Sequence, residues 1–158
     1  MNNYAFIDGT NLHMTYAHLT WRIDYHKLRI YLKEKYFVSK AYYFVGRSPS
    51  NDFLYLELER DGYILMFKPV SYLSDGRIKG NCDAELVLQA MIDKSNFDKA
   101  VIVTSDGDFS CLVKHLTSCD KLLRVIAPCL AGCSHLLKQA AGSKIDFLDN
   151  MKGKLEYK

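Results

Sequence analysis

Four aspartates stand at positions where a fold could gather their carboxylates: Asp8, Asp83, Asp106 and Asp108. Asp8 and Asp106 each come shortly after an apolar run and are each followed by glycine. Crowded carboxylates repel one another and raise one another's pKa unless a cation neutralises them. Mg2+ and Mn2+ suit such a site, because these hard ions prefer oxygen ligands and keep waters for a substrate phosphate. A bound ion can activate water and stabilise charge on a phosphate, so this chemistry requires no catalytic histidine or serine.

The apolar runs ahead of Asp8 and Asp106 predict the centre of the fold. Residues 4–7 and 100–103 are continuously apolar, which is typical of strands buried on both faces of a parallel sheet. Further strands are predicted over residues 37–45, 63–67, 122–127 and 145–148, and helices over about residues 11–20, 24–36, 51–61, 81–94, 109–116 and 134–141. This alternation predicts an α/β fold: a single doubly wound, Rossmann-like parallel sheet with right-handed crossovers and helices on both faces.

The winding of such a sheet reverses once, and we expect the reversal between the first strand and the strand over 100–103. Open α/β sheets bind ligands at the carboxyl ends of the strands beside this switch point. Asp8 and Asp106 would then flank one crevice. Asp83 lies three and four residues before Leu86 and Val87 of its helix, which puts it on the inward face at the first turn.

Each of these polar residues also has a purely structural interpretation. Asp108 precedes Phe109 and is a good N-cap residue. Asp83 could complement a helix dipole, and the two aspartates that precede glycine could form turns. Asn11 could cap the first helix or position substrate or water. The residues alone leave these alternatives open.

Basic residues gather where the predicted strands end. Arg47 follows the strand over 37–45, Lys68 ends the next strand, and Arg77 and Lys79 precede Asp83. Phosphate oxygens are natural partners for such a rim, and the alternative is solvated surface charge. Tyr72 on the same loop could stack on a base, although a loop tyrosine is more often packed.

Length and composition limit the class of protein. The 158 residues suit one domain, and 49% hydrophobic with 25% charged residues is ordinary for a soluble globular chain. A net charge of +3 permits nucleic acid as a partner without arguing for it. The five cysteines form no Cys-x-x-Cys pair, no apolar run has the length of a membrane span, and the N-terminus lacks a signal-peptide pattern. We therefore expect a cytoplasmic protein with free thiols.

Three stretches resemble the acidic motifs of the NYN domain: FIDGTNLH, KGNCDAELVLQAM and VTSDGDFSCLV. This family is part of the PIN-like superfamily of metal-dependent ribonucleases, and the resemblance is to its bacterial LabA-like branch. The stretch RIDY at residues 22–25 and the ending at 134–148 are also similar, so nearly the whole chain is covered. The resemblance implies an NYN/PIN-like nuclease domain over residues 1–150 and a short charged C-terminal tail over 151–158.

The resemblance also implies roles for particular residues. The metal-binding acids of the family fall on Asp8, Asp83, Asp106 and Asp108. Asn11 is assigned to the catalytic residues. Ser105 is the small hydroxyl residue before the third motif and would contact substrate. It implies Mg2+ or Mn2+ as cofactor and endonucleolytic cleavage of RNA. One departure is the pair Asn81-Cys82 ahead of the second motif's acid, where the family commonly has Gly-Val.

The leading hypothesis is thus a divalent-metal-dependent endoribonuclease, with Arg47, Arg77 and Lys79 holding the RNA backbone. A haloacid-dehalogenase-like phosphatase is excluded, because it needs a nucleophilic aspartate at the position of Phe6. A response-regulator receiver is excluded, because the strand over 63–67 does not end in aspartate. The open alternatives are a regulatory module that binds RNA or metal but scarcely cleaves, and a protein-interaction subunit such as a homodimer.

Overall fold

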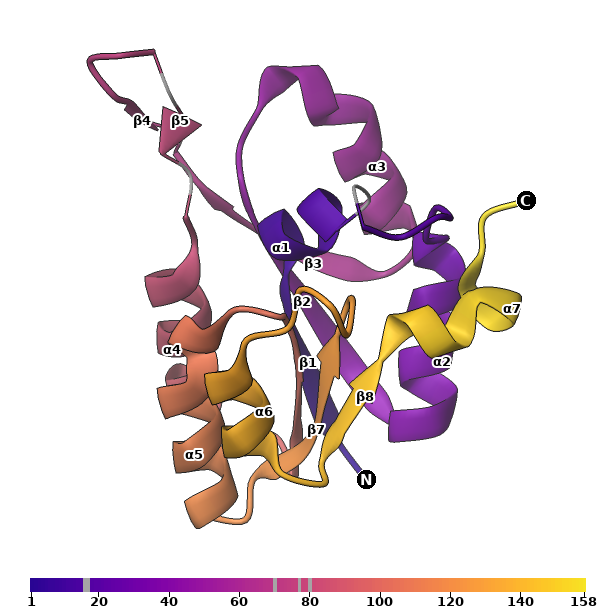
Figure 1. The fold of residues 1–158 in the computed structure, drawn as a ribbon, viewed down its shortest axis with the longest axis vertical. Coiled ribbons are helices and arrows are strands. Elements are labelled where there is room, and N and C mark those ends of the chain that lie inside the picture. Colours follow the sequence, from indigo (N-terminus) through magenta and orange to yellow (C-terminus); the bar gives the residue numbers. More distant parts are fainter. Residues whose placement is uncertain (16–17, 70, 77, 80) are drawn as a thin grey trace.

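A parallel sheet forms the centre of the computed structural model, which describes residues 1–15, 18–69, 71–76, 78–79 (backbone only) and 81–158. Over these residues the sheet has six strands in the order β3-β2-β1-β6-β7-β8 (Figure 1). The strands are β1 (Asn3–Asp8), β2 (Val38–Gly46), β3 (Tyr63–Lys68), β6 (Ala100–Val103), β7 (Leu122–Ala127) and β8 (Ile145–Phe147). The helices are α1 (Gly9–Met14), α2 (Tyr25–Tyr36), α3 (Asp52–Arg60), α4 (Asp83–Ile92), α5 (Ser110–Ser118), α6 (His135–Ala141) and α7 (Lys152–Leu155). Short 3-10 turns are η2 (Pro49–Asn51), η3 (Gly107–Phe109) and η4 (Leu148–Met151).

β1 lies in the middle of the sheet, as its continuous apolar sequence predicts. It pairs in parallel with β2 on one side and with β6 on the other, so that Phe6 stands beside both Tyr42 and Ile102. The chain winds outward from β1 through β2 to β3, and then returns to β6 and winds the other way. The predicted α/β class, doubly wound topology and position of the switch point, between β1 and β6, are confirmed.

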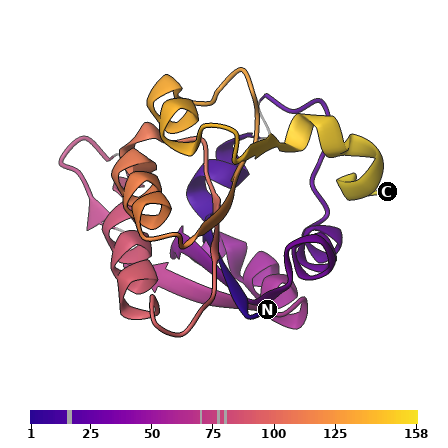
Figure 2. The same cartoon turned by 90° about the horizontal axis from the view of Figure 1, so that it is seen from below.

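The sheet separates two apolar cores, and alternate residues of β1 point into each. Tyr4 and Phe6 pack with residues of α4, α5 and α6. Ala5 and Ile7 pack with residues of α2, α3 and α7. Figure 2 shows α4, α5 and α6 together on one side of the sheet, with α2 and α7 on the other. Because the strand is buried on both faces, period-2 alternation of polar and apolar residues is absent from its sequence.

α1 is shorter than the sequence indicates. The helix predicted to reach residue 20 ends at Met14, and Thr15 serves as its C-cap. The Thr15 hydroxyl donates a hydrogen bond of 2.7 Å to the Asn11 carbonyl, and the backbone amides of His18 and Leu19 both donate to the Thr15 carbonyl. These local bonds satisfy backbone carbonyls where α1 ends.

Two features beyond the sheet were not predicted. Strands β4 (Ser71–Tyr72) and β5 (Ile78–Lys79) pair in antiparallel fashion, too briefly for a sequence pattern to reveal them. The last residues are more ordered than a charged tail suggests, because Leu155 is 1% exposed and accepts a hydrogen bond from the Asp24 amide. No helix in the described ranges is both long and apolar enough to cross a bilayer.

Candidate metal centre

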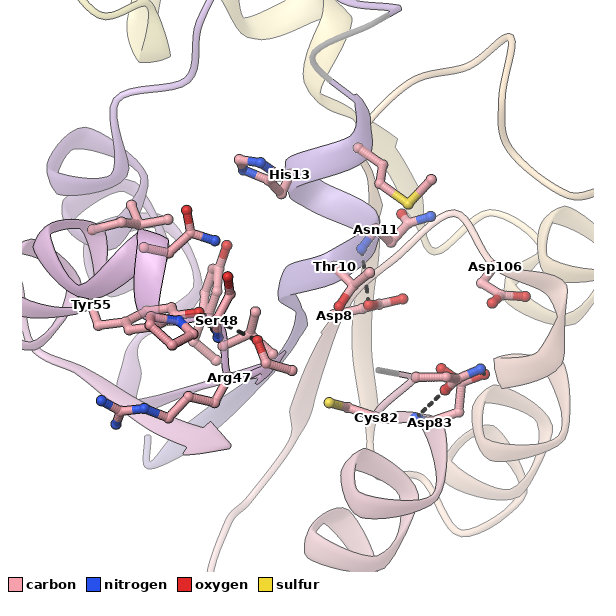
Figure 3. Close-up of a pocket in the computed structure, with 18 of the residues that line it drawn as sticks. Asp8, Thr10, Asn11, His13, Arg47, Ser48, Tyr55, Cys82, Asp83 and Asp106 are labelled. Carbon is pink, nitrogen blue, oxygen red and sulfur yellow. Dashed lines mark hydrogen bonds between the residues drawn. The ribbon is translucent and has the colours of Figure 1, made fainter. Parts of the chain in front are cut away.

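Three carboxylates converge at the carboxyl edge of the sheet. Asp8 ends β1, Asp83 begins α4, and Asp106 follows β6 by way of two polar residues. One oxygen of each lies within 4.8 Å of the others. Figure 3 shows the three side chains turned toward one another from these separate segments. The site therefore lies at the switch point, where the rule for open α/β sheets places ligands.

Asp8 is held in place by hydrogen bonds to both of its oxygens. Its Oδ1 accepts from the Asn11 backbone amide at 3.1 Å, which makes Asp8 the N-cap of α1. Its Oδ2 accepts from the Thr104 hydroxyl at 2.9 Å. The residue is only 7% exposed. A carboxylate oxygen carries two lone pairs, so one acceptor site remains on each oxygen for a cation.

The carboxylates are costly to ionise in this position. Burial, opposed by the hydrogen bonds from Asn11 and Thr104, raises the pKa of Asp8 from 3.8 to about 6, and the charges of Asp83 and Asp106 add to the rise. Burial also raises the pKa of Asp83, with contributions from Asp106 and Asp108, while the hydrogen bond from Asn81 and the charge of Lys68 oppose it. A cation between the acids would offset both costs.

Thr104 connects two of the acids and was not singled out from the sequence. Its side chain is fully buried at the end of β6. The Thr104 hydroxyl donates to Asp8 and accepts at 3.1 Å from the Asp106 amide, so the positions of the two carboxylates depend on one side chain. The sequence does contain a signal for this role, because a hydroxyl residue directly after a wholly apolar strand is buried and needs a hydrogen-bond partner.

Asn81 positions Asp83. It is the first residue of the Asn81-Cys82 pair that departs from the family pattern. Its Oδ1 accepts from the Asp83 amide at 2.7 Å, and its Nδ2 donates to the Asp83 carboxylate at 3.0 Å. The Asn81 carbonyl in turn accepts from Lys68 Nζ at 2.8 Å, and Lys68 forms an ion pair with Glu85. Asn81 thus holds both the backbone at the start of α4 and the side chain of Asp83.

The geometry of the acids fits a divalent ion. Opposite ligands of Mg2+ lie about 4.2 Å apart, twice the usual metal–oxygen distance of about 2.1 Å. The 4.8 Å limit of the group is close to this value, and small side-chain rotations cover the difference. All three donors are carboxylate oxygens, the ligands that hard cations prefer. The cost of burying Asp8 as an anion is a second property of this chain that a cation would relieve.

The structure separates Asp108 from the other three acids. Asp108 is exposed and is not a member of the group, although its charge contributes to the raised pKa of Asp83. Its backbone amide donates to Asp106 Oδ1 at 2.9 Å, so Asp106 caps this turn and Asp108 does not. Two residues of separation along a 3-10 turn are enough to direct the two side chains apart.

Asn11 and Ser105 join α1 to the loop after β6. The Asn11 side-chain carbonyl accepts from the Ser105 amide at 2.9 Å, and Ser105 is 6% exposed. The Ser105 carbonyl accepts from the Ser134 amide. Among the described residues no hydrogen-bond partner lies near the buried Ser105 Oγ. Both residues therefore hold the loop that carries Asp106.

The predicted basic rim is only partly seen. The Arg47 guanidinium pairs with Asp52 at 3.2 Å and lies over the Phe67 ring, and Figure 3 shows it pointing away from the acids. Arg77 lies outside the described residues. Lys79 belongs to β5, and its side chain is also outside the described part. Of the two basic residues whose side chains are described, Lys68 contacts the acidic segment, at the Asn81 carbonyl, and Arg47 does not.

A cavity of about 520 Å³ opens beside the carboxylates. The three acids with Asn11, Asn81 and Cys82 line it, and Figure 3 shows Arg47, Ser48 and Tyr55 across from the acids. Other lining residues come from α1, β2, η2, α3 and β4. Burial raises the pKa of the Cys82 thiol to about 11, with a contribution from Glu85. This thiol is therefore protonated at neutral pH and is not a nucleophile.

Comparison with known proteins agrees with the motifs. The profile of the NYN domain matches residues 4–148, and this confirms the resemblance at the level of the family. A protein of unknown function from Vibrio parahaemolyticus has a similar structure, with a TM-score of 0.80 and 22% identity over 98% of this chain and 95% of its own. At that identity the likeness concerns the fold alone. No curated protein matched the chain.

Proposed function

Because the chain belongs to the NYN domain family, within the PIN-like nuclease superfamily, we propose that it is a divalent-metal-dependent endoribonuclease. The observation that carries the proposal is the group of three carboxylates within 4.8 Å at the switch point. A protein that only bound RNA would gain nothing from holding mutually repelling acids, one of them nearly buried. Acids that hold a cation supply one established route to phosphodiester hydrolysis, because the ion activates water and stabilises charge on the phosphate.

In this proposal Asp8, Asp83 and Asp106 hold the ion, either Mg2+ or Mn2+. When bound, such an ion supplies Lewis-acid stabilisation of charge on the phosphate and lowers the pKa of a water. Asp108, which is exposed, is either a further ligand of the ion or the acceptor that orients the attacking water. Asn11 fixes the loop that carries Asp106, through its bond to the backbone beside it.

The RNA backbone is proposed to contact basic and hydroxyl residues around the acids. Arg77 and Lys79 come from the segment between β4 and α4, which precedes Asp83. Arg47 joins them only after it gives up its ion pair with Asp52, and that exposed pair is weak enough to break. Ser105 is proposed to contact the RNA as well. A cytoplasmic location, membership of the LabA-like branch and a homodimer are further parts of the proposal.

Cleavage of a labelled RNA in Mg2+, Mn2+ or EDTA tests the proposal. We expect cleavage by wild type with either ion, none in EDTA, and a loss of about a hundredfold or more in Asp8→Asn and Asp106→Asn. Glu34→Gln removes an exposed acid of α2, outside the cluster, and serves as the matched control. Undiminished cleavage in both aspartate variants would contradict the assignment of the site.

A wild-type protein that binds Mn2+ or RNA but cuts no RNA would favour the other hypothesis, a regulatory module of the same fold. Calorimetric titration of Mn2+ into wild type and Asp8→Asn separates this outcome from an inert preparation. Loss of Mn2+ binding in the variant, without cleavage by either protein, identifies a metal-binding module.

A further inference from the structure

We propose that the cavity beside the acids binds one unpaired nucleobase of the RNA, next to the phosphate that is cut. The inference rests on the proposed function and deepens it, because it names single-stranded RNA as the substrate. Nothing in the three acids themselves distinguishes single-stranded from double-stranded RNA, since a cation at that point recognises only phosphate. The cavity supplies the distinction.

The position of the cavity determines which part of a nucleotide enters it. Asp8, Asp83 and Asp106 line it, so a ligand whose phosphate is at the acids has its neighbouring group inside the cavity. In an RNA strand that neighbour is a ribose with its base. The volume of about 520 Å³ falls within the range of roughly 300–1,000 Å³ that is usual for small-molecule sites.

The lining has the mixed chemistry that a base requires. Val45, Leu54 and Tyr55 supply apolar surface, and Ser48 and Asn51 supply hydrogen-bonding groups beside it. A base likewise has apolar faces and polar edges. Tyr72, on β4, also lines the cavity and is 72% exposed, and an exposed ring that lines a cavity is suited to stack on a base.

Hydrogen bonds within the protein hold tyrosine side chains of the cavity wall in place. The Tyr55 hydroxyl donates to the Gly46 carbonyl at 3.3 Å and accepts from the Ser48 amide at 3.0 Å. The Tyr43 hydroxyl donates to the Gly9 carbonyl at 3.4 Å, and Figure 3 shows Tyr55 and Ser48 on the opposite side of the cavity from α1. A wall fixed in this way spares the ordering cost of binding.

A base inside a double helix cannot reach such a cavity. It is paired on one edge and stacked on both faces, and it must leave the helix to enter a pocket. Sequence-tolerant proteins that act on single strands combine phosphate contacts with aromatic surfaces for bases. Here the proposed metal site would supply the phosphate contact, and Tyr55 and Tyr72 line the cavity as the aromatic surfaces. Duplex RNA should therefore be a much poorer substrate than a single strand.

The first experiment measures binding to the Mn2+-loaded protein by calorimetry. The ligands are uridine 5'-monophosphate, adenosine 5'-monophosphate and ribose 5-phosphate, which carries the same phosphate without a base. We expect the nucleotides to bind about tenfold more tightly or better, the usual effect of one stacked base. Asn51→Trp fills the cavity and should abolish the preference, and Tyr72→Ala should reduce it.

Leu56→Trp is the matched control, because Leu56 lies on α3, is 60% exposed and does not line the cavity. It should keep the preference for nucleotides. The Mn2+-induced rise in Tm, measured for every variant, shows that the fold and the acids remain intact. If Asn51→Trp lacks this rise, Tyr72→Ala alone decides the result.

The second experiment compares cleavage of one RNA sequence as a single strand and as a duplex. Equal rates, or equal affinities of wild type for ribose 5-phosphate and the nucleotides, would overturn the base-binding proposal. A wild type that prefers nucleotides but cuts no RNA would instead refute the proposed function and leave the cavity assignment standing. The two failures are thus distinguishable.

Discussion

Asp8→Asn should stabilise the metal-free protein, although it removes a buried residue's charge and a proposed ligand. The pKa of Asp8 rises from 3.8 to about 6, chiefly because of burial. At 1.36 kcal/mol for each tenfold change in proton affinity, the ionised side chain costs about 3 kcal/mol at pH 8. Asparagine avoids this cost but has a single acceptor oxygen, so either the Thr104 hydroxyl or the Asn11 amide loses its acceptor, which costs about 1 kcal/mol. The expected net gain is about 2 kcal/mol.

The pH dependence of this difference has a definite sign. Because the folded pKa of this acid is raised, its destabilising effect is full above pH 6 and disappears as the pH falls toward 3.8. At pH 4.5 we expect wild type and Asp8→Asn to agree within about 1 kcal/mol. Urea unfolding in EDTA at pH 8 and pH 4.5 measures both differences. A variant that is less stable than wild type at pH 8 would refute the reasoning.

Added metal should remove the advantage of the variant. An ion at fifty times its Kd stabilises the folded state by about 2 kcal/mol, and only wild type should gain this at the same concentration. Glu34→Gln should follow wild type both in EDTA and in Mn2+, because the exposed acid of α2 lies outside the carboxylate group. An equal Mn2+ response in wild type and Asp8→Asn would show that Asp8 is not a ligand.

Three further substitutions test the supports of the site. Asn81→Ala should cost about 1 kcal/mol of stability in urea and weaken Mn2+ binding about tenfold, and an unchanged Kd would contradict its role. Gly9→Ala should cost about 2 kcal/mol of stability, because a Cβ there would overlap a tyrosine ring and lie 2.7 Å from a carbonyl of β2. Gly132→Ala is the control and should cost far less stability, because no atom lies within 4 Å of a Cβ at that position. Equal losses of stability in the two variants would count against this packing argument. Thr104→Val should cost about 2 kcal/mol and raise the pKa of Asp8 further, as followed by NMR, and a stable variant would show that the hydroxyl is dispensable.

The parts of the site that the sequence predicts are those set by rules of the fold. Asp8 and Asp106 follow wholly buried strands on either side of a reversal in winding, and that topology brings them together whatever their neighbours are. Asp83 was predicted by helical spacing from Leu86, which is 1% exposed on the core side of α4. Burial and periodicity are properties of long segments, so they survive small errors in the bounds of each element.

The remaining features depend on single contacts that no pattern encodes. The direction of Arg47 is decided by Asp52, five residues later and across a turn. Asn81 reads as a departure from a motif until its two bonds to Asp83 are visible. The cavity requires α1, β2, α3 and β4 to meet, and only the folded chain brings these segments together.

The switch point also divides the work between different parts of the chain. The acids come from β1, α4 and the loop after β6, whereas the cavity wall away from them comes largely from the end of β2, η2, α3 and β4. Changes in the second set can reshape the cavity without moving a carboxylate. A chain built in this way can acquire a new ligand preference through a few loop substitutions, and the group of three carboxylates stays unchanged.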